Sequence, residues 1–97
     1  MRYTILVAPE ARQDLKSLEA HVRAGVRDAI ERHLRYEPKK VSRSRIKRLR
    51  GIRHPQYRLR VDEIRVFYDV SSGVVEVLAV VPKSQAASWL ARAGASE

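Results

Sequence analysis

Residues 57–83 read YRLRVDEIRVFYDVSSGVVEVLAVVPK, and this stretch decides the fold. Apolar and basic residues alternate over 57–61 and again over 64–68, a period of two that is typical of half-buried strands. Polar breaks at 62–63 and 71–73 separate these strands from residues 74–81, which are apolar on both faces apart from Glu76. The pattern predicts a three-stranded antiparallel meander whose last strand is central in the sheet and covered on both sides.

Three arginines of this meander are expected on one face of the sheet. If the break at 62–63 is a tight hairpin, Arg58 and Arg60 point the same way, and Arg65 joins them from the next strand. One interpretation is that these arginines bind nothing and simply keep an exposed sheet soluble and protected from edge pairing. Because no acidic residue alternates with these arginines on that face, phosphate binding is the stronger interpretation.

Length and charge narrow the class of protein. The chain has 97 residues, with twenty Lys and Arg against eleven Asp and Glu, so its formal net charge is +9. This length suits one domain over residues 1–97, and the charge favours a polyanionic partner. With no cysteine and three scattered histidines, we expect neither a metal site nor a cofactor. No apolar run suits a signal peptide or a membrane span, so a cytoplasmic protein that binds no membrane is expected.

The segments around the meander predict an α+β fold. Residues 2–7 alternate as a first strand, and Pro9 suits the first turn of a helix. Two helices are expected as a hairpin, separated near Gly25, with the second over 26–34 and ended before Pro38. This hairpin would cover one face of the sheet and leave the other open. A short helix is predicted over 84–92, capped by Ser84, with fraying from Gly94 onward.

The most basic run of the chain is KKVSRSRIKRLRGIR at residues 39–53. We interpret it as a loop anchored to the core by Ile46 and Leu49, with Gly51 permitting a sharp change of direction. It directly precedes the strand that carries Arg58, so a continuous positive surface is expected. The candidate nucleic-acid-binding residues of this run are Lys47, Arg48, Arg50 and Arg53.

A series of short motifs in a fixed order resembles the RelE/ParE superfamily of bacterial type II toxins. The motifs are Tyr3-x-Ile5, Ala11-x-x-Asp14-Leu15, a helix ending near Pro38, Arg48-Leu49-Arg50-Gly51, YRLRV at 57–61, IRVFY at 64–68 and VLAV at 77–80. The resemblance covers almost the whole chain, and YRLRVDEIRVFYDV is its most specific part. It implies a RelE-like, microbial-ribonuclease-like fold and a cognate antitoxin, encoded by the adjacent gene, that forms a hetero-oligomer with the toxin.

The resemblance also implies one of two activities. RelE-like members cut messenger RNA in the ribosomal decoding site, whereas ParE-like members inhibit DNA gyrase without catalysis. The catalytic set that carries over consists of Arg58, Arg60, Arg65 and Lys83. A further arginine of RelE-like toxins falls on Ser84 here, and their late catalytic tyrosine falls on or near Leu90, beside Trp89.

RNA cleavage without a metal requires three chemical tasks: activation of the 2′-hydroxyl, stabilisation of charge on the phosphorane and protonation of the leaving 5′-oxygen. Arginines suit the second task but carry protons poorly. The possible acid or base residues are His54, whose type titrates near neutral pH, and Tyr68. We give more weight to the simpler interpretations, in which His54 is a loop residue before Pro55 and Tyr68 is an aromatic residue of the core.

The favoured prediction is therefore a ribosome-dependent, metal-independent mRNA endoribonuclease that inhibits translation, with the ribosome and messenger RNA as partners. A ParE-like gyrase inhibitor is the alternative. A third possibility is an inactive copy, because the family arginine and tyrosine are replaced at Ser84 and Leu90.

Overall fold

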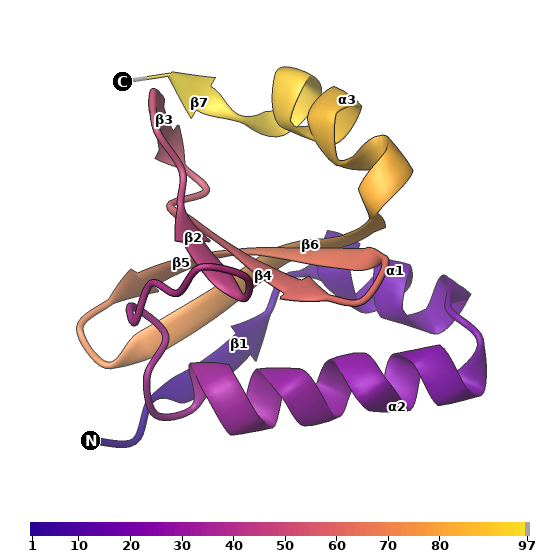
Figure 1. The fold of residues 1–97 in the computed structure, drawn as a ribbon, viewed down its shortest axis with the longest axis horizontal. Coiled ribbons are helices and arrows are strands. Elements are labelled where there is room, and N and C mark those ends of the chain that lie inside the picture. Colours follow the sequence, from indigo (N-terminus) through magenta and orange to yellow (C-terminus); the bar gives the residue numbers. More distant parts are fainter. Residues whose placement is uncertain (97) are drawn as a thin grey trace.

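A five-stranded sheet forms the centre of the computed structural model, which describes residues 1–96 (Figure 1). Its strand order is β1-β6-β5-β4-β2, and β6 runs parallel to β1 and antiparallel to β5. The strands are β1 (Thr4–Val7), β2 (Ile46–Arg48), β4 (Tyr57–Val61), β5 (Ile64–Ser71) and β6 (Val74–Pro82). The predicted meander is β4-β5-β6, and the predicted α+β class is confirmed.

Two helices, α1 (Pro9–Ser17) and α2 (Ala20–Ala29), lie on one side of the sheet, and a π-helical turn η1 (Ile30–Leu34) continues α2. The predicted break at Gly25 is wrong, because Gly25 lies inside α2. A single exposed glycine weakens a helix by only about 1 kcal/mol relative to alanine, which tertiary packing can offset. The chain turns instead at Leu18 and Glu19, whose extended backbone lets the half-buried Leu18 pack on the core.

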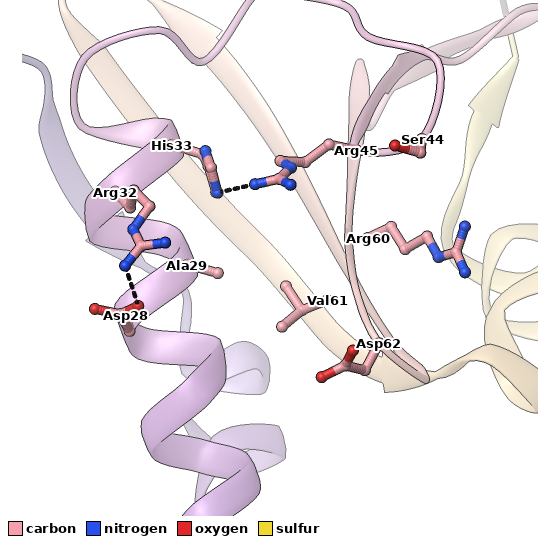
Figure 2. Close-up of a pocket in the computed structure, with 9 residues that line it drawn as sticks. All are labelled: Asp28, Ala29, Arg32, His33, Ser44, Arg45, Arg60, Val61 and Asp62. Atoms are coloured by element: carbon pink, nitrogen blue, oxygen red, sulfur yellow. Dashed lines mark hydrogen bonds and ion pairs between the residues drawn. The ribbon is translucent and has the colours of Figure 1, made fainter.

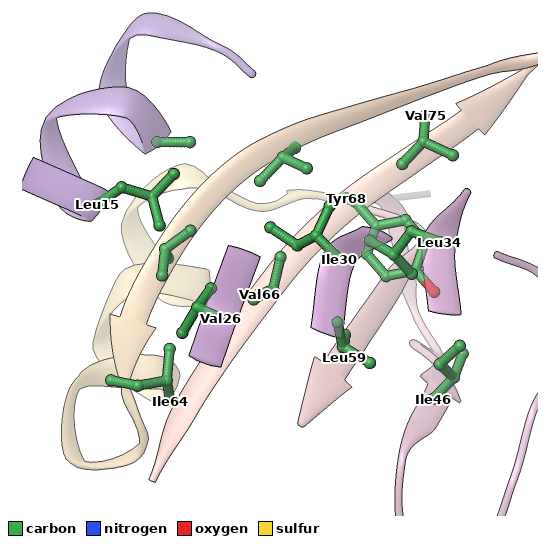
Figure 3. Packing of buried hydrophobic residues seen from close by; sticks show 13 residues of the cluster. Leu15, Val26, Ile30, Leu34, Ile46, Leu59, Ile64, Val66, Tyr68 and Val75 are labelled. Carbon is green, nitrogen blue, oxygen red and sulfur yellow. The ribbon is translucent and has the colours of Figure 1, made fainter. Parts of the chain in front are cut away.

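The main hydrophobic core fills the space between these helices and the sheet (Figure 3). Alternate residues of the meander point into it, as their period of two predicts. The helices contribute Ala11, Leu15, Val26, Ile30 and Leu34, and the strands contribute Ile46, Leu59, Ile64, Val66, Tyr68, Val75, Val77 and Val80.

A third helix, α3 (Lys83–Ala93), packs against the opposite face of the sheet, so the prediction that this face is open is wrong. The register between β5 and β6 shifts after Phe67, which pairs with Ala79 while Tyr68 pairs with Val77. Leu78 is therefore an extra residue of β6, and both Leu78 and Ala79 belong to the cluster under α3. The ring of Trp89 stacks on Phe67 with centroids 4.9 Å apart. A buried aromatic pair of this kind stabilises docking of the helix.

Trp89 also fixes α3 to the helix layer of the molecule. Its indole Nε1–H donates to the Glu10 carboxylate across 2.7 Å, and only 5% of the residue is exposed. The predicted Ser84 cap is absent, because α3 begins one residue earlier, at Lys83, and no side chain caps its first turn. Docking of Trp89, rather than a cap, therefore places this helix.

The basic run 39–53 is more ordered than the predicted loop. It contains the edge strand β2 and the short strand β3 (Ile52–His54), which pairs with β7 (Ala95–Ser96). The predicted fraying from Gly94 onward is thus wrong for Ala95 and Ser96, since β3 supplies a pairing partner. Ile46 is buried and Leu49 half-buried, as predicted, and Gly51 has a φ of +73° at the change of direction.

No helix among residues 1–96 is long and apolar enough to cross a membrane.

Candidate functional site

The arginine face is the face of the meander that carries Arg58, Arg60 and Arg65. Arg60 pairs with Arg65 across β4 and β5, and Arg58 lies two residues along β4 on the same side. Their strand neighbours Tyr57, Leu59 and Ile64 point to the helix side. The prediction that the three arginines share one face is confirmed.

Arg65 is not displayed on that face as a free guanidinium. Only 6% of the residue is exposed. Its Nη1 donates to the carbonyl of Asp62 at 2.8 Å and to that of Ile64 at 3.1 Å. Asp62 occupies a left-handed turn conformation with a φ of 52°, so Arg65 fastens the β4–β5 hairpin at its turn. The expectation of an exposed Arg65 is corrected because the hairpin's own carbonyls enclose its guanidinium.

Arg58 and Arg60 supply the unpaired positive charge of the arginine face. Arg60 is exposed, whereas Arg58 is half-buried and its Nε is buried with no hydrogen-bond partner. Burial, and then the charges of Arg65 and Arg60, lower the pKa of the Arg58 guanidinium. Among the described residues, no carboxylate forms an ion pair with any of the three arginines. A buried donor without a partner beside uncompensated charge is suited to an incoming anion.

The structure divides the basic residues of the 39–53 run between two faces. Lys47 pairs with Arg58 across β2 and β4, so it extends the arginine face. Arg48 pairs with Tyr57, lies 5.4 Å above its ring, and donates to the carbonyls of Leu49 and Gln56 at 3.1 and 2.8 Å. Arg50 and Arg53 are exposed around β3. Lys47 is therefore the member of this run that the sheet register brings to Arg58.

Lys83 is exposed at the start of α3, next to the β4–β5 hairpin. Its backbone N–H donates to the carbonyl of Glu63 across 2.7 Å, and Val81, two residues earlier, pairs with Arg65. The structure thus places Lys83 at the same end of the sheet as Arg60. Leu90, where the resemblance expects a tyrosine, is half-buried in the cluster under α3.

Tyr68 lies on the wrong side of the sheet to act with the arginines. It is fully buried in the main core, stacks on Tyr57 with centroids 5.5 Å apart, and its hydroxyl donates to the Pro38 carbonyl at 2.6 Å. Burial, with a smaller contribution from Tyr57, raises the pKa of Tyr68 well above its ordinary value. The structure therefore contradicts Tyr68 as an acid or base, because a sheet separates it from Arg58.

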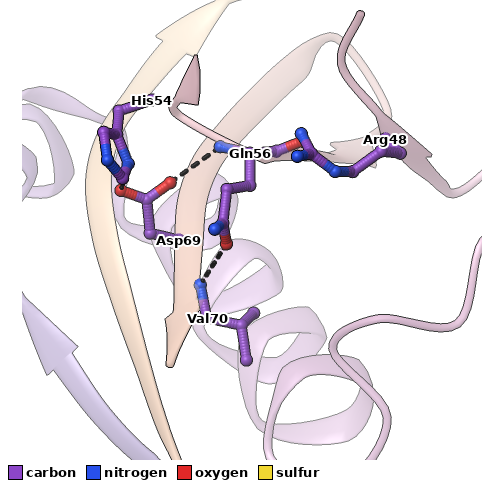
Figure 4. A network of polar contacts seen from close by, with 5 residues as sticks. All are labelled: Arg48, His54, Gln56, Asp69 and Val70. Carbon is purple, nitrogen blue, oxygen red and sulfur yellow. Dashed lines mark hydrogen bonds and ion pairs between the residues drawn. The ribbon is translucent and has the colours of Figure 1, made fainter. Parts of the chain in front are cut away.

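His54 belongs to a polar network at the opposite end of β5 from the hairpin (Figure 4). Its Nδ1 lies 2.7 Å from Oδ2 of Asp69, and the other carboxylate oxygen accepts the backbone N–H of Gln56, also at 2.7 Å. Gln56 Oε1 accepts the backbone N–H of Val70 at 2.8 Å. We did not predict the roles of Asp69 and Gln56, because residue spacing contains no signal for a contact between residues 15 positions apart. Alternation along β5 places Asp69 on the same face as Phe67, and this local signal indicates on which side of the sheet Asp69 lies.

A cavity of about 540 Å³ lies between the end of α2 and the β4–β5 hairpin (Figure 2). Arg45 reaches into it and contacts Nε2 of His33, while the Arg60 guanidinium points away from it. Burial, and then the charges of Arg45 and Arg32, lower the pKa of His33. The cavity therefore borders the arginine face at Arg60, which is one of its lining residues, but the Arg60 guanidinium lies outside it. No group of side chains within residues 1–96 is arranged to hold a metal ion.

Comparison with known proteins gives a family and a set of similar structures. The family model of the ParE toxin of the type II toxin-antitoxin system parDE matches residues 5–87. A search of curated proteins finds no match.

Several of the similar structures are toxin–antitoxin complexes. One is the RelBE2 complex of Mycobacterium tuberculosis, with 26% identity, a TM-score of 0.70, and 84% of this chain and 99% of that chain covered. Another is the RelE–RelB complex of Pyrococcus horikoshii, with 25% identity, a TM-score of 0.65, and coverage of 88% and 99%. A mutant of the E. coli toxin RelE in the free state has 21% identity, a TM-score of 0.69 and 92% coverage of both chains, and this likeness shows the fold alone.

Proposed function

We propose that this chain, which belongs to the ParE toxin family of type II toxin-antitoxin systems, inhibits translation by cutting messenger RNA on the ribosome. The proposal is supported by the arginine face and by the likeness to RelE toxins in complex with their antitoxins. In this proposal Arg58 and Arg60 bind the scissile phosphate at the arginine face. Lys47 and Lys83 extend the positive charge on either side of them, and the exposed Arg50 and Arg53 bind the flanking RNA. Arg48 has no part in this proposal, because it lies on the Tyr57 side of the sheet and donates to backbone carbonyls. Arg65 contributes indirectly, because its buried guanidinium holds the β4–β5 hairpin that presents Arg60.

The state of Arg58 is the observation that carries the proposal. Its buried Nε has no hydrogen-bond partner, and no carboxylate among residues 1–96 pairs with Arg58 or Arg60. A buried unsatisfied donor is costly, and a planar guanidinium matches two phosphate oxygens at once. The phosphorane carries more negative charge than the ground-state phosphate, so the same contacts strengthen as the reaction proceeds. The arginine face is thus suited to the charge-stabilising part of RNA cleavage.

We further propose that the chain forms a hetero-oligomer with a cognate antitoxin. The similar solved structures include toxin–antitoxin complexes. A formal charge of +9 favours an acidic partner segment. Such a segment, disordered alone, would fold on the toxin and raise its apparent stability.

The test is a cleavage assay with purified ribosomes programmed with a defined messenger RNA. We expect cuts only when ribosomes are present, and we expect Arg58→Ala to slow them by about 10²–10³-fold. Arg60→Ala should also slow cleavage. If both arginines bind one phosphate, the fold-loss in rate of the double variant should be smaller than the product of the two single fold-losses. Arg27→Ala removes an exposed arginine from α2, on the helix side of the sheet, and should leave the rate unchanged.

Inhibition of DNA gyrase is the second candidate, and two observations favour it. The matching family model is that of the ParE toxin. Both tyrosines of the meander, Tyr57 and Tyr68, point to the helix side, so neither can carry protons on the arginine face. Inhibited supercoiling by purified gyrase, with messenger RNA left intact, would assign the chain to this activity. If neither target is affected, the substitutions at Ser84 and Leu90 identify an inactive copy.

A further inference from the structure

His54 and Asp69 form a carboxylate–imidazole pair whose geometry fixes the imidazole hydrogen. A carboxylate oxygen only accepts hydrogen bonds, so the 2.7 Å contact requires the hydrogen on Nδ1 of His54. The neutral ring then presents Nε2 as a free acceptor. The side chain of Asp69 is 19% exposed and that of His54 is 51% exposed. A covered carboxylate therefore orients an accessible base.

The imidazole is not needed to fasten its own segment to the sheet. Gln56 already does so through its backbone N–H to Asp69 and its side-chain oxygen to Val70. Arg48 adds a bond to the Gln56 carbonyl. The second oxygen of Asp69 is thus left for His54, which is the arrangement expected of an orienting group rather than of a structural fastening.

The pair lies on the same side of the sheet as the arginines. Asp69, Phe67 and Arg65 alternate along β5, and the extra residue at the register shift, Leu78, belongs to β6, so the three residues share one face of the sheet. Arg58 pairs with Phe67, which makes Asp69 its diagonal neighbour at about 7–8 Å. His54 also lines a hollow of about 290 Å³ beside Leu78 and Trp89 on the α3 side. Neither Arg58 nor Arg60 lines this hollow, so the ribose attached to a phosphate on Arg58 must extend along β5, past Phe67, to meet the imidazole.

We propose that His54, oriented by Asp69, is the general base of RNA cleavage at the arginine face, an inference that rests on the proposed ribonuclease function. Nε2 takes the proton of the ribose 2′-hydroxyl while the 2′-oxygen bonds to phosphorus. The bond from phosphorus to the 5′-oxygen breaks, and that oxygen leaves with its electron pair and a proton from water. The imidazolium, held by Asp69, returns its proton to solvent. The products are a 2′,3′-cyclic phosphate and a 5′-hydroxyl end.

The experiment measures single-turnover cleavage on programmed ribosomes as a function of pH. His54→Ala should slow cleavage by about 10²–10⁴-fold and should remove the acidic limb of the pH–rate profile. Added imidazole should restore part of the rate. His21→Ala is the matched control, because His21 is an exposed histidine 3.6 Å from a carboxylate, that of Glu19, but lies on α2. It should cleave like the wild type.

Asp69→Asn separates positioning from folding. An amide oxygen still accepts the Gln56 N–H, so the segment stays attached, but the imidazolium loses its counter-charge. The single-turnover rate at neutral pH should then fall, while the half-saturating ribosome concentration stays that of the wild type. A full rate in His54→Ala while Arg58→Ala is slow overturns the role of His54 and leaves the ribonuclease proposal standing. A full rate in Asp69→Asn likewise overturns the positioning role of Asp69. If the wild-type protein makes no cuts, both the ribonuclease proposal and the role of His54 as its base are wrong.

Discussion

Replacing Arg65 by alanine should destabilise the protein far more than replacing its register partner Arg60. The Arg65 guanidinium is buried and donates to two backbone carbonyls at 2.8 and 3.1 Å. Hydrogen bonds from a charged group contribute about 1.5–3 kcal/mol, and truncation also leaves the two hairpin carbonyls without this partner. Removing a charge near Arg58 relieves some repulsion. We therefore expect the free energy of unfolding to fall by about 2–3 kcal/mol.

Arg60→Ala is the matched control, because the two arginines face each other across β4 and β5. Arg60 is exposed, so its truncation should change the free energy of unfolding by no more than about 0.5 kcal/mol. In a domain of this size the Arg65 effect corresponds to a fall in Tm of roughly 10–20 °C. Urea unfolding followed by fluorescence of Trp89, the single tryptophan, measures both variants. Equal stability of the two variants would refute the inference that Arg65 fastens the hairpin.

Three further predictions follow from contacts elsewhere in the molecule. The fold lowers the pKa of His33 below its ordinary 6.5. The unfolded chain therefore takes up this proton first, so stability should be lost as pH falls below about 6.5, and His33→Gln should flatten that loss in urea titrations at several pH values. Glu10→Ala removes the acceptor of the Trp89 indole N–H and should cost about 1–2 kcal/mol, with red-shifted tryptophan emission; unchanged emission would contradict this contact. Val66→Asp places an unpaired charge at a fully buried strand position and should abolish cooperative unfolding, and a cooperatively folded variant would contradict the assigned core.

The meander could be predicted from sequence because its physical signal is local. A period of two over residues 57–68 fixes which side chains point together, and a continuous apolar run at 74–81 is what a central strand requires. The helix break could not be located in the same way. Gly25 is a weak local signal, whereas the turn at Leu18 and Glu19 depends on how Leu18 packs against the core.

Short strands and the covering of a face depend on partners distant in the chain. β2 and β3 have three residues each and form because β4 and β7 lie beside them. The basic run that contains them has a composition typical of a loop, so no pattern within it predicts a strand. In the same way, α3 covers part of the arginine face because Trp89 meets Phe67, a contact between residues in different elements.

The candidate site shows the same division. Alternation correctly predicted that Arg58, Arg60 and Arg65 share a face, but it contains no information about burial. Arg65 is enclosed by carbonyls of its own turn and Arg58 is half-covered, while Arg60 stays exposed. Tyr68 was a candidate acid or base by residue type, and only its core position and its bond to the Pro38 carbonyl exclude it.

The most direct test of the central claim is a map of messenger RNA 5′ ends in cells after induction of the chain. Wild type and Arg27→Ala should both produce new ends within translated regions, and co-expression of the neighbouring antitoxin gene should remove them. Arg58→Ala should reduce them by about 10²-fold or more while the protein remains folded. Growth arrest with intact messages, or undiminished cutting by Arg58→Ala, would contradict the account.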